Sequence, residues 1–174
     1  MGDVIVRKLT EDDWQLYRSV RLRALEESPE AFVAVLADEV QRDDDYWKAR
    51  MQRSQRLLAE IDHEVVGIAS VGAVHGRDEA AQLFGLWVDP ERRGTGAATE
   101  LVRAGAIVAR AQGKRHLLYW VGTENGRAVA FASGFGFRPT SERRPMRVVS
   151  EDDGEEEIAM DLPLADRIGN APRP

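Results

Sequence analysis

The chain has 174 residues, 43% of them apolar and 31% charged, which is typical of one globular domain rather than of a disordered chain. It contains no cysteine, which excludes disulfides, thiolate metal ligands and a cysteine nucleophile. The formal net charge of −6 disfavours a nucleic-acid partner. No apolar run approaches the roughly 20 residues that span a bilayer, and the first residues lack the pattern of a secretory signal. We therefore expect a cytoplasmic protein with neither a nucleic-acid nor a membrane partner.

The N-terminal half predicts a strand, two helices and a hairpin. Near-alternation of apolar residues over 4–9 indicates the strand. Helices are predicted at 10–28 and from residue 43 onward, because each begins with acidic residues that favour the positive end of a helix dipole. Apolar stretches at 56–61 and 65–73, separated by three polar residues, predict the hairpin.

The C-terminal half predicts alternating strands and helices. In order, these are a polar loop at 75–80, a buried strand at 82–88, a helix at 95–112, a strand at 116–121, a short helix at 125–135, and strands at 146–149 and 157–164 around a turn at 151–154. The strand–helix–strand unit over 82–121 requires a parallel pair joined by a right-handed crossover. The pattern indicates a single α/β domain over residues 3–164 with a mixed sheet, followed by a flexible tail at 165–174.

The turn at 88–98 carries the clearest chemical signal. A buried strand ends in a glycine-rich turn that opens a long helix, so free backbone amides and the positive dipole end would face an approaching anion such as a diphosphate. The structural alternative is that Gly94 and Gly96 only make a tight turn. No glycine–lysine pair follows, as a P-loop requires, and the third glycine of a dinucleotide fingerprint is absent.

This turn resembles the acetyl-CoA loop of the GNAT superfamily of N-acetyltransferases. The family pattern Q/R-x-x-G-x-G/A matches residues 93–98, and the preceding strand ends in the family's V-x-P at 88–90. A second family motif, N-x-x-A-x-x-F/L-Y-x-x-x-G-F, matches residues 125–137 except at Ala132, where the family has tyrosine. The order of predicted elements over residues 3–164 is also similar.

The resemblance implies a fold and a cosubstrate. The expected fold is a mixed seven-stranded sheet with helices on both faces, in which the fourth and fifth strands splay apart to form a slot for acetyl-CoA. One of the residues expected to contact acetyl-CoA, Phe131, could equally well be an ordinary core residue. The residues expected to bind acetyl-CoA are Leu86, Trp87, Val88, Arg93, Gly94, Thr95, Gly96, Ala97, Ala98, Asn125, Ala128 and Phe131.

The resemblance also implies catalytic roles, and the chain departs from the family at two of them. The amide of Leu86 would stabilise the oxyanion of the reacting thioester. Gln82 stands where the family usually has a glutamate base, and an amide cannot accept the amine proton. Ala132 stands where the family has a tyrosine acid, and alanine has no proton to donate. We expect Glu79 to hold a catalytic water, unless its loop is simply solvated, and Tyr119 to protonate the thiolate, unless it faces the core.

The expected activity is direct acetyl transfer from acetyl-CoA to an amine, since no cysteine can carry the acetyl group. The amine could belong to a small molecule, a protein N-terminus or a lysine. The alternative is a non-catalytic acyl-CoA-binding sensor, which the replacements at Gln82 and Ala132 would suit. No spacing of histidine and carboxylates suggests a metal, and we allow for a homodimer. The acceptor wall is expected from Glu26, Glu27, Ser28, Glu30, Phe32 and the stretch near Arg143.

Overall fold

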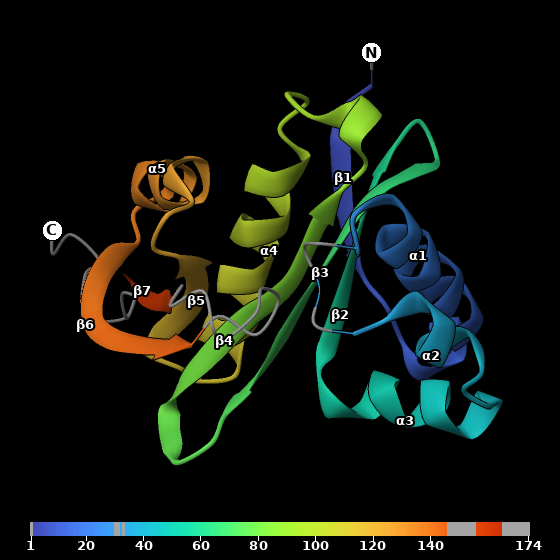
Figure 1. Ribbon diagram of the computed structural model, residues 1–174, viewed down its shortest axis with the longest axis horizontal. Helices are drawn as coiled ribbons and strands as arrows, with labels where there is room; N and C mark the ends of the chain where they lie inside the picture. The colour runs from blue at the N-terminus through green and yellow to red at the C-terminus, as the bar shows by residue number, and fades with distance from the viewer. Residues whose placement is uncertain (1, 30–31, 33, 146–155, 165–174) are drawn as a thin grey trace, which may run out of the picture.

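The fold was taken from a computed structural model, which describes residues 2–29, 32, 34–145 and 156–164. Its centre is one seven-stranded sheet in the order β1-β2-β3-β4-β5-β7-β6, in which only β4 and β5 run parallel (Figure 1). The strands are β1 (Val4–Lys8), β2 (Gln55–Ile61), β3 (Glu64–Val74), β4 (Arg77–Val88), β5 (His116–Gly122), β6 (Arg138–Pro145) and β7 (Glu156–Pro163). The helices are α1 (Trp14–Glu27), α2 (Leu36–Val40), α3 (Asp44–Arg53), α4 (Ala97–Ala111) and α5 (Gly126–Phe135), with short 3-10 turns at Glu11–Asp13 and Pro90–Arg92.

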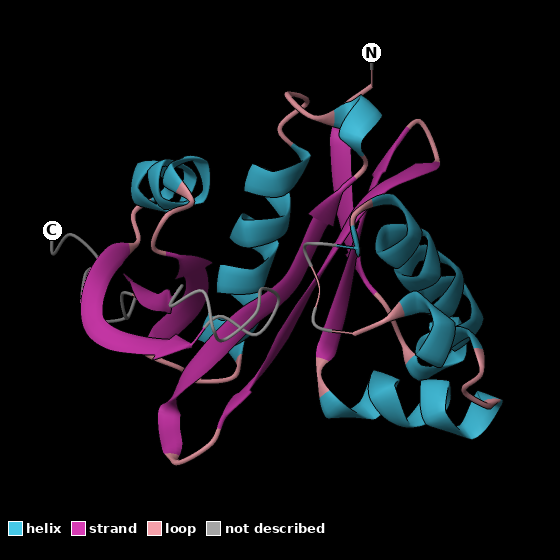
Figure 2. Cartoon of the chain, in the orientation of Figure 1, coloured by secondary structure: helices cyan, strands magenta, loops and turns pink. Residues whose placement is uncertain are grey.

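Helices α1, α2 and α3 cover one face of the sheet (Figure 2). Helix α1 presents a buried stripe at helical spacing, and its core partners include Trp47 of α3 and Ile68 of β3. Aspartate begins α3, since the side chain of Asp43 accepts a hydrogen bond from the amide of Tyr46 at 2.9 Å. This layer therefore places the C-terminal end of α1 beside the end of β4.

Helices α4 and α5 lie on the opposite face (Figure 2), so that helices cover both faces of the sheet, as the family resemblance implies. Helix α4 packs closely on the sheet because Gly105 has no side chain. A Cβ at this position would lie 2.9 Å from Cδ1 of Leu83. The main core lies under α4, where residues such as Leu101 and Val102 are fully buried. This packing fixes the start of α4 relative to the end of β4.

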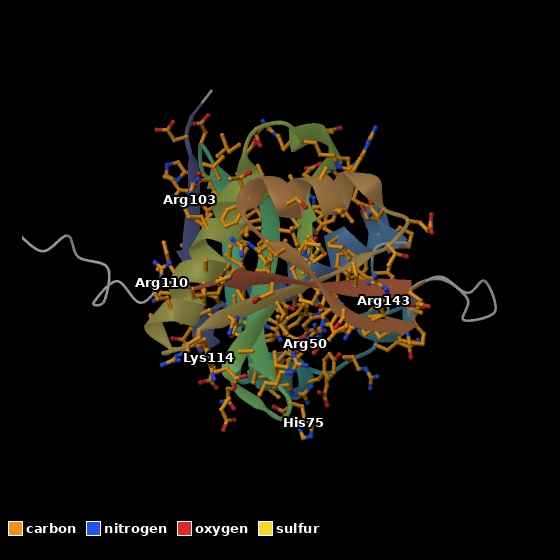
Figure 3. All side chains as sticks on the ribbon, turned by 90° about the vertical axis from the view of Figure 1, so that its left-hand side faces the viewer. Arg50, His75, Arg103, Arg110, Lys114 and Arg143 are labelled. Atoms are coloured by element: carbon orange, nitrogen blue, oxygen red, sulfur yellow. The ribbon has the colours of Figure 1, made fainter. Side chains whose placement is uncertain are left out.

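Three details differ from the sequence prediction. Residues 75–80 do not form a loop, because pairing with β3 carries β4 down to Arg77 and leaves only His75 and Gly76 in the turn (Figure 3). The short helix α2 was not predicted. The sixth strand is Arg138–Pro145, whereas the predicted strand at 146–149, the turn at 151–154 and the tail at 165–174 lie outside the described residues.

Candidate active site

The parallel pair β4–β5 splays apart, as predicted. Pairing covers only four residues of each strand, from Ala80 opposite His116 to Leu83 opposite Tyr119. Strand β4 continues to Val88 while remaining paired with β3 on its other edge. Backbone groups of the last β4 residues therefore face a gap between the two strands instead of a neighbouring strand.

A β-bulge lies at the point where the strands part. Gly85 and Leu86 of β4 together face the single residue Ala69 of β3, between the pairs Ile68–Trp87 and Ser70–Phe84. Gly85 has a φ of +62°, in the left-handed region that glycine tolerates best. The bulge turns Leu86 toward the gap, and Leu86 lines the cavities on both of its sides.

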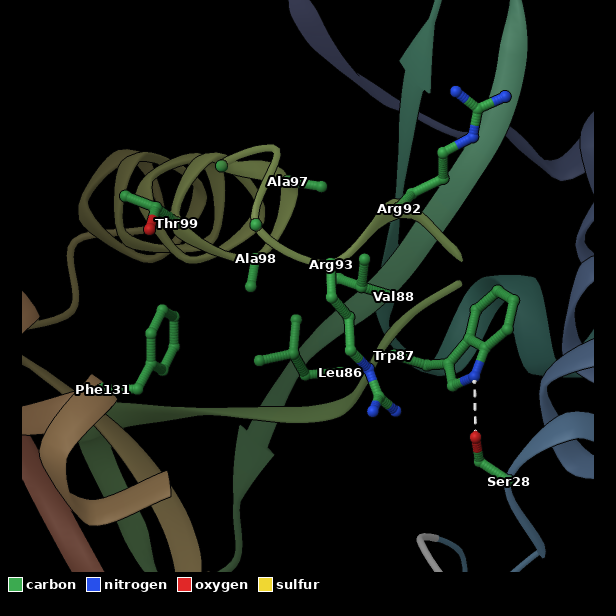
Figure 4. A pocket seen from close by; sticks show the side chains of 12 residues that line it. Ser28, Leu86, Trp87, Val88, Arg92, Arg93, Ala97, Ala98, Thr99 and Phe131 are labelled. Carbon is green, nitrogen blue, oxygen red and sulfur yellow. Dashed lines mark hydrogen bonds between the residues drawn. The ribbon is translucent and has the colours of Figure 1, made fainter. Parts of the chain in front are cut away.

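The first cavity, of about 470 Å³, joins the end of β4 to the start of α4 (Figure 4). Gly96 is the N-cap of α4 with a φ of +90°, and a glycine offers no side chain to cap the helix. The amides of the first helical turn have no acceptor within the helix, and the positive end of the dipole lies behind them. The cavity is lined by Ser28, Leu86, Trp87, Val88, Arg92, Arg93, Gly94, Gly96, Ala97, Ala98, Thr99 and Phe131.

Nine of the twelve residues predicted to bind acetyl-CoA line this cavity. The other three are Thr95, Asn125 and Ala128. The Thr95 hydroxyl donates to the Arg92 carbonyl at 2.6 Å and so shapes the turn. The Asn125 side chain accepts from the Ala128 amide at 3.1 Å, which makes it the cap of α5 rather than a lining residue.

Sequence reasoning about acetyl-CoA binding missed Ser28, Arg92 and Thr99 in this cavity. The indole of Trp87 is buried, and its Nε1 donates to Oγ of Ser28 at 3.2 Å, as Figure 4 shows. This bond ties the end of α1 to β4. The place of Thr99 in the cavity could have been expected from the predicted helix start, since Thr99 belongs to the first turn of α4.

The second cavity, also of about 470 Å³, lies on the other side of Leu86. Tyr119 lines it and packs edge-on against Phe137 with ring centroids 6.0 Å apart. Burial raises the pKa of the Tyr119 phenol. Gln82 also lines it, with Nε2 donating to the Ala73 carbonyl at 3.3 Å. The complete lining is Arg21, Phe32, Ala34, Gln82, Leu83, Phe84, Gly85, Leu86, Tyr119, Trp120, Arg144 and Glu157.

The structure separates Glu79 from these two cavities. Glu79 is exposed on β4 and lines a smaller cavity of about 200 Å³ with His116 and Asp161. The reason is that β4 begins at Arg77, eight residues before Gly85 of the bulge, so Glu79 lies near the far end of the strand. This placement argues against the expected role of Glu79 in holding a catalytic water at Leu86.

The predicted acceptor wall is partly brought together. Ser28 lines the first cavity and Phe32 the second, whereas Glu26 and Glu27 are exposed and line neither, and Glu30 lies outside the described residues. On β6 the lining residue is Arg144 rather than Arg143, because alternate residues of a strand face opposite sides. Ala132, which replaces the family's tyrosine, is fully buried in the core.

Comparison with known proteins agrees with this geometry. Residues 13–137 match the model of the acetyltransferase (GNAT) family. An N-acetyltransferase of Methanocaldococcus jannaschii is 30% identical over 99 residues, covering 53% of this chain and 43% of that protein. Human N-acetyltransferase 8 is 35% identical over 88 residues, covering 49% and 39%. The chain thus spans less than half the length of these two curated relatives.

Solved structures share the fold at low sequence identity. The protein yncA of Salmonella typhimurium, solved with acetyl-CoA, has a TM-score of 0.70 at 19% identity, covering 99% of both chains. The ribosomal-protein-S18-alanine N-acetyltransferase of Escherichia coli has a TM-score of 0.67 at 20% identity, covering 94% of this chain and 95% of that one. In the described part of the chain, no helix is long and apolar enough to cross a membrane.

From the family match over residues 13–137, together with the splayed strands, we conclude that this chain belongs to the GNAT acetyltransferase family.

Proposed function

We propose that this protein is an acetyl-CoA-dependent N-acetyltransferase whose catalytic domain comprises residues 3–164. The observation that carries the proposal is the position of Leu86. It lies where β4 has no pairing with β5, between a cavity that leads to the start of α4 and a second cavity of similar size. One cavity suits the cosubstrate, the other the amine, and Leu86 lies where their reacting atoms would meet.

The first cavity fits acetyl-CoA by its chemistry. The free amides from Arg93 to Ala98 would bind the diphosphate, because a glycine-rich helix start favours an anion. A Cβ at Gly94 or Gly96 would meet nothing within 4 Å, so this turn is open on its outer side. The backbone of Leu86 and Val88, which has no partner on the β5 side, would bond the amide groups of the pantetheine arm as a missing strand would. The acetyl-CoA bound to yncA supports this assignment.

The chemistry of the step assigns roles to three groups. The neutral amine attacks the thioester carbon, so a C–N bond forms and the C–S bond breaks as CoA thiolate leaves. The amide of Leu86 would stabilise the oxyanion of the intermediate. Only about one alkyl amine in a thousand is neutral at pH 7, and the amine proton would leave through water. The thiolate would take its proton from water or from Tyr119, which burial keeps in its protonated form and which would regain a proton from water.

The test is calorimetric binding of acetyl-CoA to Gly96→Glu. A glutamate there would place a negative charge where the diphosphate lies, and affinity should fall at least tenfold, about 1.4 kcal/mol. Gly76→Glu is the matched control, since Gly76 also has a positive φ (+77°) and open space but lies in the β3–β4 turn. Unchanged affinity in folded Gly96→Glu would overturn the cosubstrate site. Tight binding without turnover of any amine would favour a non-catalytic acyl-CoA sensor.

A further inference from the structure

Arg21 of α1 brings a buried guanidinium to the floor of the second cavity. Its side chain is 11% exposed and stacks on Phe32, with Cζ 4.6 Å from the ring centroid. A Cβ built on Gly85 would lie 4.0 Å from Nη1 of Arg21. The guanidinium is therefore beside the bulge, next to the place where the attacking amine must sit.

Arg21 lines the second cavity, and the described residues leave its terminal nitrogens open to a ligand. Within the described residues, its one hydrogen bond runs from Nε to Oε1 of Glu39, at 3.4 Å. Nη1 and Nη2 have no hydrogen-bond acceptor in that same part of the chain, although the side chain is almost entirely buried. Two parallel N–H donors are the arrangement that binds a carboxylate in bidentate fashion.

The surroundings of Arg21 carry a surplus of positive charge. Glu39 is shared with Arg50, whose Nη1 donates to it at 2.9 Å. Burial opposes ionisation of Glu39, but the hydrogen bond from Tyr46 and the charge of Arg50 outweigh it and lower the pKa of this carboxyl. Buried Arg56 bonds neutral groups instead, among them Oγ of Ser70 at 2.8 Å. In the described part of the chain, two guanidinium groups, those of Arg21 and Arg50, therefore share the carboxylate of Glu39.

Among the described residues, the opposite wall of the cavity adds no net negative charge. Arg144 stacks on Trp120 at 4.1 Å and pairs with Glu157, whose Oε2 lies 3.0 Å from Nη2. This pair is neutral as a whole. The described lining of the cavity therefore carries one more positive than negative side chain, even though the protein as a whole has a net charge of −6.

We propose that the acceptor is a free α-amino acid, whose carboxylate binds Arg21 while its amine attacks at Leu86. This inference rests on the proposed function and names the substrate class of the same site. The amine and carboxylate of an α-amino acid are one carbon apart, which suits the closeness of Arg21 to the bulge. A protein N-terminus offers an amide in place of the carboxylate, and a polyamine offers a second cation, so both are disfavoured.

The test compares the twenty L-amino acids with their α-carboxamides by calorimetric titration of the wild type, with and without saturating CoA. At least one acid should bind tenfold or more tightly than its amide, because the amide cannot form the charged pair. The same acid should also show the higher kcat/KM in a thiol-release assay. A wild type that binds no acid more tightly than its amide would overturn the inference.

Variants locate the effect. Arg21→Gln should remove the preference of acid over amide, and Arg21→Lys should keep part of it because the charge remains. Arg18→Gln, on the same helix but lining neither cavity, should behave as the wild type. A preference that survives in folded Arg21→Gln would also contradict the inference. If the wild type does not bind CoA, the proposed function is contradicted instead. In that case the titrations without CoA still test whether an amino acid binds more tightly than its amide.

Discussion

Replacing Gly85 with valine should remove most of the turnover while leaving the protein folded. Gly85 has a φ of +62°, which is a genuine outlier for a β-branched residue. The nearest atom to an added Cβ is Nη1 of Arg21, at an ordinary contact distance of 4.0 Å. The cost of the substitution is therefore conformational rather than steric, at least about 1–2 kcal/mol.

The chain can relieve that cost by giving up the bulge, which would move the amide of Leu86. Loss of one oxyanion donor typically lowers kcat by about 10²–10³, or roughly 2.7–4 kcal/mol. We expect kcat to fall about 100-fold or more in a thiol-release assay at saturating acetyl-CoA, with a smaller change in acetyl-CoA affinity because the α4 turn is untouched.

Gly76→Val separates this effect from general destabilisation. Gly76 has a similar φ of +77° and open space around it, but it lies in the turn between β3 and β4. Both variants should lose about 2–8 °C in Tm, at 2–4 °C per kcal/mol, and only Gly85→Val should lose kcat. A folded Gly85→Val with the kcat of Gly76→Val would refute the role of the bulge.

Tyr119→Phe should lower kcat less than about 100-fold, because a thiolate with a pKa of ~8.5 leaves readily; a loss above about a thousandfold in initial rates would identify an indispensable acid. The wild-type rate should climb from pH 7 toward 9 as the acceptor amine becomes neutral, since burial raises the pKa of Tyr119 and keeps its phenol protonated there. A bell-shaped pH–rate profile centred near 7 would contradict this. Glu39→Gln should lower the free energy of unfolding by about 3–5 kcal/mol in urea denaturation, because it leaves Arg21 and Arg50 without their buried partner. The pKa of Glu39 is lowered in the folded protein. The difference in unfolding free energy between the wild type and Glu39→Gln should therefore be full above the unfolded carboxyl pKa of ~4.3 and shrink as the pH falls through the folded pKa. A difference that stays constant down to pH 3 would argue against the ion pairs.

Local patterns predict most of the sheet and the anion-binding turn at the start of α4, while the family resemblance implies the rest of the cosubstrate slot. The strands at 56–61 and 116–121 and the helix ending near Gly113 depend on hydrophobic periodicity and turn residues within one segment. The glycine-rich turn that starts α4 is likewise contiguous in sequence. Nine predicted cosubstrate residues meet in one cavity because that cavity is built mainly from the β4–α4 junction.

Most of the acceptor side could not be predicted because it combines distant segments. Arg21, Tyr119 and Arg144 come from α1, β5 and β6, and nothing in their local sequence indicates that they share a cavity. The polar composition of 75–80 predicts a loop around Glu79, whereas pairing with β3 keeps this residue in a strand. The bulge at Gly85 has a weak local signal, a single glycine within an apolar strand, which typically marks such irregularities.

Acetyl transfer itself is tested most directly by quantifying both products of one reaction. The wild-type protein is incubated with acetyl-CoA and each member of a panel of amines, with free CoA measured by thiol titration and acetylated amine by mass spectrometry. We predict equal amounts of CoA and acetylated amine for at least one acceptor, and no CoA release when the amine is omitted. Tight acetyl-CoA binding without acetylation of any amine would contradict the proposed N-acetyltransferase activity.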